Sequence, residues 1–157
     1  MTVTFPEFSP SRAGSLPLIA DDLALDFANT ESGRGFPSHQ NHFREAKNVV
    51  EWLRHAKALP VEEADWLRAR VAESADLAAD LLAQAIALRE AIHDIGAALG
   101  HRAKPPEAAL ASLSALHARC VAEAELAPAL RRVAGSGACA LRRSRRRWVP
   151  SLWRRCG

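Results

Sequence analysis

Apolar positions recur at helical spacing along two consecutive stretches of this 157-residue chain. In residues 42–59 they fall at steps of three and one and trace one face of a helix. Pro60 ends this stretch, and the two acidic residues at 62 and 63 suit the positive first turn of a second helix over residues 61–71. The side of this second helix that is expected to be buried consists of Trp66, Leu67 and Val71.

The longest apolar stripe covers residues 74–100 and predicts a helix of about seven turns. This helix is expected to end at Gly100 in a left-handed cap, because glycine has no Cβ. Pro105 and Pro106 then open a fourth helix, since proline is tolerated in a first turn, and Pro128 closes the region. The long stripe consists of Leu77, Leu81, Leu82, Ala85, Leu88, Ile92, Ile95 and Leu99, and the inward face of the fourth helix consists of Leu110, Leu113, Leu116 and Cys120.

The residues before the first helix have a less regular pattern. Residues 1–15 lack periodicity and are expected to form a flexible lead-in. Apolar residues alternate imperfectly over residues 16–30, so a short strand and a single helical turn both stay open, and the glycines and proline of residues 32–37 indicate a loop. The pattern predicts a mainly α fold of four or five helices packed around the stripe of residues 74–100, with a small β element near residues 16–30.

Composition fits one globular domain of this kind, with 48% hydrophobic and 25% charged residues. No run of about 20 apolar residues occurs, so no membrane span is expected. The first residues lack the basic start and apolar run of a secretion signal. The three cysteines (Cys120, Cys139 and Cys156) are odd in number and widely separated, so they do not form a disulfide framework. A reducing cytoplasm is the expected location.

Charge divides the chain sharply. Residues 1–130 carry 12 Lys and Arg against 18 Asp and Glu, whereas residues 131–157 carry nine Arg and no acid. The basic tail has no apolar period, so we expect it to be poorly ordered, and two origins stay open: a genuine tail, or the product of a frameshift near Ala134. Its clustered basic and aromatic side chains are candidates for weak, salt-dependent nucleic-acid contact. They are Arg142, Arg143, Arg145, Arg146, Arg147 and Trp148.

Three segments in the same order resemble one protein family. Residues 23–30 read LALDFANT, residues 50–59 read VEWLRHAKAL and residues 85–93 read AIALREAIH. They are similar to the LALDFVNT opening, the L-x-x-W-L-x-x-x-G-L helix and the A-x-x-LREA helix of the ABATE-domain proteins. These are predicted stress-induced transcription regulators that usually end in a zinc finger with a Cys-Gly-Asn-Arg signature. The resemblance covers residues 16–120.

The resemblance implies a regulatory domain attached to a DNA-binding zinc finger, but the finger is missing from this sequence. Val149 stands where the family has a cysteine, and the chain reaches Cys156 without the following Asn-Arg. There is no Cys-x-x-Cys pair, and tetrahedral zinc needs about four Cys or His ligands. We therefore expect no zinc or other cofactor, and an ABATE-like domain over residues 16–130 that is incomplete. Missing core partners would lower its stability or cause self-association.

Four polar residues are candidates for a ligand site or for structural roles. Asp26, Asn29 and Thr30 follow an apolar run and could bind an effector, although such side chains more often cap turns and helix ends. Arg89 interrupts the longest stripe and could anchor an acidic ligand. The favoured alternative is a structural pair with a carboxylate such as Asp26, because a buried arginine is costly without a partner.

Other chemistry is not indicated. The six histidines lack the spacing of a metal site, and no phosphate loop, nucleophile elbow or dinucleotide motif occurs, so the chain is not expected to be an enzyme. The function that the sequence favours is a regulatory domain of a transcription regulator with an unknown small-molecule effector. The alternative is a truncated helical interaction domain with neither ligand nor catalytic activity.

Overall fold

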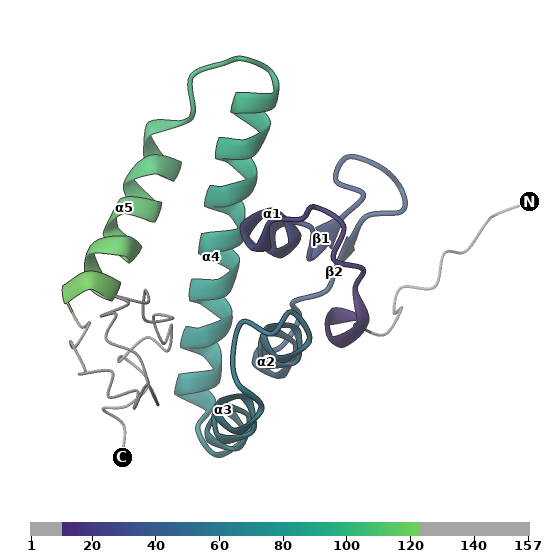
Figure 1. Ribbon diagram of the computed structural model, residues 1–157, viewed down its shortest axis with the longest axis vertical. Helices are drawn as coiled ribbons and strands as arrows, with labels where there is room; N and C mark the ends of the chain where they lie inside the picture. Colours follow the sequence, from purple (N-terminus) through teal and green to yellow (C-terminus); the bar gives the residue numbers. More distant parts are fainter. Residues whose placement is uncertain (1–10, 123–157) are drawn as a thin grey trace, which may run out of the picture.

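The computed structural model describes residues 11–122, which form five α-helices, one 3-10 turn and one two-stranded hairpin (Figure 1). The predicted mainly α fold is confirmed. The tail of residues 131–157, with its candidate arginines and Trp148, lies outside the described residues. In chain order the elements are η1 (Ala13–Ser15), α1 (Leu23–Ala28), β1 (Glu31–Ser32), β2 (Gln40–Asn41), α2 (Ala46–His55), α3 (Val61–Glu73), α4 (Ala75–Gly100) and α5 (Glu107–Ala122).

The fold is organised around α4, which contacts α1, α2, α3 and α5. In Figure 1, α5 runs antiparallel along one side of α4, while α1 and the hairpin lie on the other side. The axes of α2 and α3 cross that of α4, so both helices are seen nearly end-on. The expected packing around the stripe of residues 74–100 is therefore present. None of the helices within residues 11–122 is long and apolar enough to cross a membrane.

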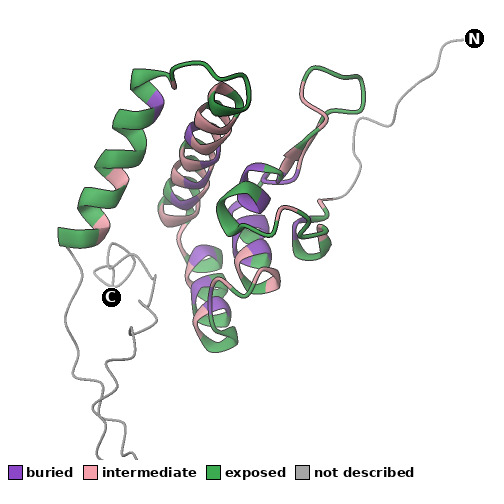
Figure 2. Cartoon of the chain, turned by 45° about the horizontal axis from the view of Figure 1, so that its top comes forward, coloured by how far each residue is buried: buried purple, intermediate pink, exposed green. Residues whose placement is uncertain are grey.

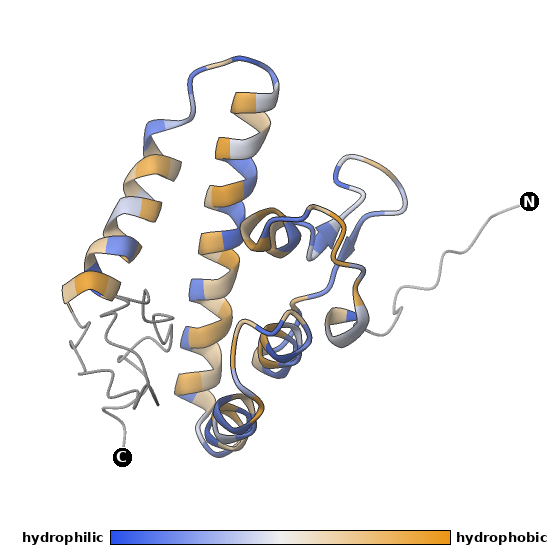
Figure 3. Cartoon of the chain, viewed as in Figure 1, coloured by the Kyte–Doolittle hydropathy of each residue, from blue (hydrophilic) through white to orange (hydrophobic). Residues whose placement is uncertain are grey.

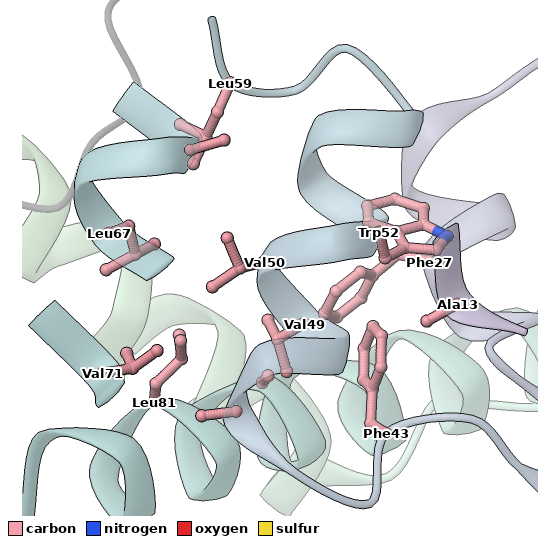
Figure 4. Close-up of a cluster of buried hydrophobic side chains, with 13 residues drawn as sticks. Ala13, Phe27, Phe43, Val49, Val50, Trp52, Leu59, Leu67, Val71 and Leu81 are labelled. Carbon is pink, nitrogen blue, oxygen red and sulfur yellow. The ribbon is translucent and has the colours of Figure 1, made fainter. Parts of the chain in front are cut away.

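Three aromatic side chains form the centre of the core (Figure 4). The ring centroid of Phe27 lies 5.4 Å from that of Phe43 and 5.0 Å from that of Trp52. The rings of Phe43 and Trp52 meet edge to face at 6.4 Å. Such tilted and edge-to-face contacts add to the stability gained from burying the rings themselves. The trio joins α1, α2 and the segment between the hairpin and α2 in one apolar unit.

The predicted helix of residues 42–59 is shorter in the structure. It begins at Ala46, because Glu45 and Asn48 form a capping box that satisfies the first backbone donors. It ends at His55, and Lys57 then adopts a left-handed conformation with φ of 55°. His42 lies outside the helix, yet it is buried.

The second predicted helix begins at the predicted residue and ends two residues later than predicted, and one of its predicted buried residues is exposed. Trp66 is 44% exposed, whereas Leu67 and Val71 are buried together with Ala64. Residues 64, 67 and 71 follow the i, i+3, i+7 spacing of one helix face, and position 66 lies about 100° to 160° around the helix from each of them.

The long helix begins where it was expected, with the side chain of Ser74 accepting a hydrogen bond from the Leu77 N–H. The prediction of a left-handed cap at Gly100 is wrong, because Gly100 is the last helical residue. The left-handed residue is Arg102, with φ of 55°. The apolar stripe also extends past its partners, since Leu99 is 61% exposed.

The segment before the hairpin resolves the choice left open for residues 16–30. Residues 23–28 form the short helix α1, whose first backbone donors are capped by Asp22. The small sheet lies just beyond the predicted range, with Glu31 opposite Asn41 and Ser32 opposite Gln40. At the other end of this segment Ala13 is fully buried, so the packed body includes residues that precede position 16.

Candidate functional site

The side chain of Arg89 on α4 joins the hairpin to this helix. Its exposed fraction is only 3%, and Nη2 lies 2.5 Å from a carboxylate oxygen of Glu31 on β1. Nη1 donates to the side-chain oxygen of Asn41 on β2 at 2.7 Å, and Nε donates to Glu90 at 2.8 Å. Both strands are thereby tied to the middle of the longest helix. A buried guanidinium with this many partners is well satisfied.

Two further side chains extend this network toward solvent. Arg34 donates to both carboxylate oxygens of Glu90, at 2.6 and 2.9 Å, and lies 2.8 Å from Glu31. His39 contacts the other oxygen of Glu31 at 2.6 Å. The hydrogen bond from Arg34 lowers the pKa of Glu90 to about 2, assisted by the hydrogen bond from Arg89, and the same bond raises the pKa of Arg34. The charges of the two arginines and two glutamates balance in this network, which also includes Asn41 and His39 and is hereafter called the clasp. Within the described residues, the Nε atom of Arg34 is the one buried side-chain nitrogen of the clasp without a hydrogen-bond partner.

The carboxylate suggested for Arg89 was the wrong one. Asp26 accepts hydrogen bonds from the backbone N–H groups of Ile19 and Ala20, at 2.9 and 3.0 Å. It therefore holds the segment before α1, while Glu31 reaches Arg89 because the hairpin folds against α4. The pairing of Arg89 with a carboxylate is present, and only the identity of the partner needs correction.

The two remaining polar candidates also bind nearby backbone. Thr30 is fully buried, and its hydroxyl donates to the carbonyl of Phe27 at 2.7 Å. Asn29 is exposed and forms the C-cap of α1 through its backbone N–H. The four candidates thus do not converge on one cavity. Asp26, Asn29 and Thr30 shape the ends of α1, and Arg89 belongs to the clasp.

A buried histidine fixes the start of the described chain. The Nδ1 atom of His42 accepts from the N–H of Arg12 at 3.3 Å, and the Ser11 hydroxyl donates to the His42 carbonyl at 2.8 Å. Burial lowers the pKa of His42, and the nearby Arg12 and Arg44 lower it further, so the ring is neutral at pH 7. Within residues 11–122 no three His, Cys, Asp or Glu side chains gather as they would around a metal ion.

The described residues also form an open apolar groove of about 550 Å³. Its floor is the core itself, including Phe27, Trp52 and Leu81, and α5 contributes Leu116 at one edge. Polar side chains enter its lining only at Asp22 and Gln84. The full lining is Asp22, Leu23, Ala24, Phe27, Val49, Trp52, Leu53, Ala58, Leu59, Leu67, Leu81, Gln84, Ala85, Leu88, Ile92 and Leu116.

The groove is open because α5 covers little of the body. Ala109 is the only buried residue of α5, and most of the helix surface is exposed in Figure 2. The predicted inward face is corrected here, since Leu110 and Leu113 are 41% and 37% exposed. Apolar side chains are nevertheless frequent on α4 and α5, as the hydropathy colours of Figure 3 show.

Sequence reasoning missed this groove because it assigned every apolar position of the long stripe to the core. Leu88 and Ile92 do belong to that stripe, yet both stay partly exposed and line the groove. A usable signal was the excess of apolar residues in α1, where Leu23 and Leu25 are 50% and 46% exposed. Apolar residues of a helix that its neighbours leave partly uncovered indicate a binding surface.

Comparison with known proteins gives one positive result. The model of the ABATE family, described as "Putative stress-induced transcription regulator", matches residues 21–154. Searches of curated proteins and of solved structures found no match. The family match includes all the helices that line the groove and continues past Ala122, the last residue that the structure describes.

Proposed function

The chain belongs to the ABATE family, and from this premise we propose that it is the regulatory domain of a transcription regulator whose groove binds a small apolar or amphiphilic effector. The groove is the observation that carries this proposal. Its volume of about 550 Å³ is typical of small-molecule sites, which range from about 300 to 1,000 Å³. A wholly structural domain would gain stability by filling such a space.

The lining defines the chemistry of the effector. Apolar side chains from all five α-helices would surround the body of the molecule, and burial of apolar surface would supply the binding free energy. Asp22 and Gln84 would meet its polar end, and a carboxylate favours a ligand that donates hydrogen bonds or carries positive charge. Arg89 is outside this lining and is already paired, so it has no direct part in effector binding in this proposal.

We further propose that the domain acts by binding and not by catalysis, and without a resident metal. The titratable groups of the clasp are paired with each other, and the groove lining holds one carboxylate without a second acid, base or nucleophile beside it. Catalysis normally requires such groups in mutual contact. Zinc analysis of the purified full chain by mass spectrometry tests the second point, and one zinc ion per chain would contradict it.

The effector site is tested with a fluorescent amphiphile, dansylated undecylamine, titrated into the full chain. Ala24→Trp fills the groove from α1, where Ala24 is exposed and lines it. Ala97→Trp is the matched control, because Ala97 is exposed on α4 outside the lining. We expect saturable binding that Ala24→Trp weakens at least tenfold and Ala97→Trp leaves unchanged. Binding that is equal in the two variants would refute the proposed site.

The alternative function, a helical interaction domain without a ligand, is favoured by one observation. Leu110, Leu113 and Val121 expose 37–49% of their surface on α5, enough for an apolar contact with another protein. Under this alternative, Leu110→Asp with Leu113→Asp would abolish self-association or partner binding, and Ala24→Trp would change nothing. Under the effector hypothesis, Ala24→Trp weakens amphiphile binding, whereas Leu110→Asp with Leu113→Asp leaves it unchanged.

Nucleic-acid contact is a separate proposal and rests on the sequence of residues 131–157. Nine arginines with no acid would neutralise DNA phosphates without reading bases, and Trp148 could stack on unpaired ones. We expect weak affinity that falls steeply with salt and differs little between DNA sequences. Sequence-selective binding, or binding that is insensitive to salt, would contradict this.

A further inference from the structure

We propose that residues 123–134 of the same chain occupy the groove when no effector is bound. The docking itself is independent of the proposed function, and only its consequence, competition between this segment and an effector, rests on that function.

The first observation is where the described chain ends. Leu116 lines one edge of the groove, and Ala122 closes α5 six residues later. At the helical rise per residue this is about 9 Å of helix. A chain of eight residues reaches up to about 28 Å, so Leu130 can return to the groove without any change in the described helices.

The second observation is the match between the segment and the lining. Residues 123–134 contain Leu126, Leu130 and Val133 among small residues, and the lining they would meet is apolar except at Asp22 and Gln84. The range of the family match, residues 21–154, includes both the groove helices and this segment. Groove and segment therefore belong to one family domain.

Charge on the rim fits the same occupant. Asp22 lines the groove, and Asp80 is hydrogen-bonded to Gln84 of the lining at 2.7 Å. Both carboxylates are exposed at the surface, and Arg131 and Arg132 follow directly after Leu130 in the sequence. A covalent tether raises the effective concentration of this segment to roughly the millimolar range, which favours it over the same segment of a second copy.

The test uses the full chain with Leu23 replaced by the photo-crosslinker p-benzoyl-L-phenylalanine. Leu23 is 50% exposed and lines the groove from α1, across from α5. The matched control carries the crosslinker at Leu25, which is 46% exposed on the same helix but outside the lining. Mixing light and heavy isotope-labelled chains separates crosslinks within one chain from those between two.

We expect the Leu23 probe to crosslink to residues 123–134 of the same chain and the Leu25 probe to give at least fivefold less of this product. Leu126→Asp with Leu130→Asp should remove the product, whereas Ser136→Asp with Ser144→Asp adds the same charge outside the segment and should not. Crosslinks that join two chains, or that avoid residues 123–134, would overturn the inference.

The amphiphile titration then distinguishes this inference from the proposed function. Loss of the crosslink as dansylated undecylamine saturates the groove supports both. A crosslink that persists in a chain that binds no amphiphile supports docking of residues 123–134 in the groove and rejects the effector site. Amphiphile binding in a chain that gives no crosslink to residues 123–134 supports the effector site and rejects docking of the segment.

Discussion

The clasp and the groove differ in which side chains they bury and which they expose. The clasp contains buried charged groups, and the groove contains exposed apolar groups. In the clasp, charged groups pair with one another, and Arg89 is only 3% exposed yet has a partner at each of its three side-chain nitrogens. In the groove, apolar groups reach the surface with part of their area uncovered, as Leu23 does at 50% exposure. The closed polar network indicates a structural role, whereas the open apolar surface indicates a site for another molecule.

Replacing Arg89, the central residue of the clasp, is expected to have the largest effect on stability. Arg89→Met would leave the carboxylate of Glu31 and the amide of Asn41 without their buried partner. Loss of one member of a buried pair costs about 3–5 kcal/mol, so we expect the free energy of unfolding to fall by that amount in urea titrations. Lys104→Met removes an exposed cation paired with Glu107 and should change it by less than about 0.5 kcal/mol. If Arg89→Met left stability unchanged and abolished only amphiphile binding, Arg89 would have a role in effector binding and not the structural role assigned here.

Acid weakens the clasp at its solvent-facing side. The pKa of Glu90 is lowered from 4.5 to about 2, so the folded protein binds this proton more weakly than the unfolded chain does. The stabilisation is complete above about pH 4.5 and disappears as the pH falls toward 2. Because the Glu90 side chain is 38% exposed, we expect an effect of only about 1 kcal/mol. Urea midpoints at pH 6, 4 and 3 should fall less in Glu90→Gln than in the unmodified chain, and Glu107→Gln on α5 should retain the original slope.

His42 gives a second and smaller pH dependence at higher pH. Burial lowers its pKa below 6.5, so the unfolded chain takes up the proton first, and the stability present above pH 6.5 is lost as the pH falls through and below that value. His42→Asn keeps an acceptor for the Arg12 N–H but cannot be protonated, and it should flatten the change in melting temperature between pH 7 and 5. His117→Asn, at an exposed position of α5, should not flatten it. Equal slopes in both variants would show that His42 does not control this range.

The smallest effect on stability is expected in the groove, where the effect on binding should be clear. Leu23→Ser should change the free energy of unfolding by less than about 0.5 kcal/mol, because half of the side chain is already in water. It should weaken amphiphile binding roughly fivefold, which corresponds to about 1 kcal/mol of lost apolar contact. Leu25→Ser has the same chemistry outside the lining and should affect neither quantity. Large destabilisation by Leu23→Ser would show that Leu23 contributes to the stability of the core and not mainly to ligand binding.

The parts of the fold that depend on local signals could be predicted from the sequence. Pro60, the acidic residues at 62 and 63 and the periodic apolar positions predicted the bounds of α3 and the start of α4 to within one or two residues. The buried state of Arg89 and its need for a carboxylate could also be inferred. Glu31 could not be identified as that carboxylate, because the contact spans 58 positions and requires the hairpin to fold against α4. The groove could not be predicted for a related reason. The spacing of Leu88 and Ile92 predicts that they are core residues, and only the position of α5 shows that no described element covers them fully.

The long separation within the clasp has a consequence for the order in which the protein is made. Asn41 and Arg89 are 48 positions apart, and Arg34 and Glu90 are 56 apart. At roughly 5–20 residues per second, the ribosome finishes the hairpin about 2–11 s before it supplies the two α4 residues that hold it. During this interval Phe27, Phe43 and Trp52 are already present and can pack, since all three precede residue 60. In the nascent chain, contacts among these three rings can therefore form before the clasp, which closes only when the middle of α4 emerges.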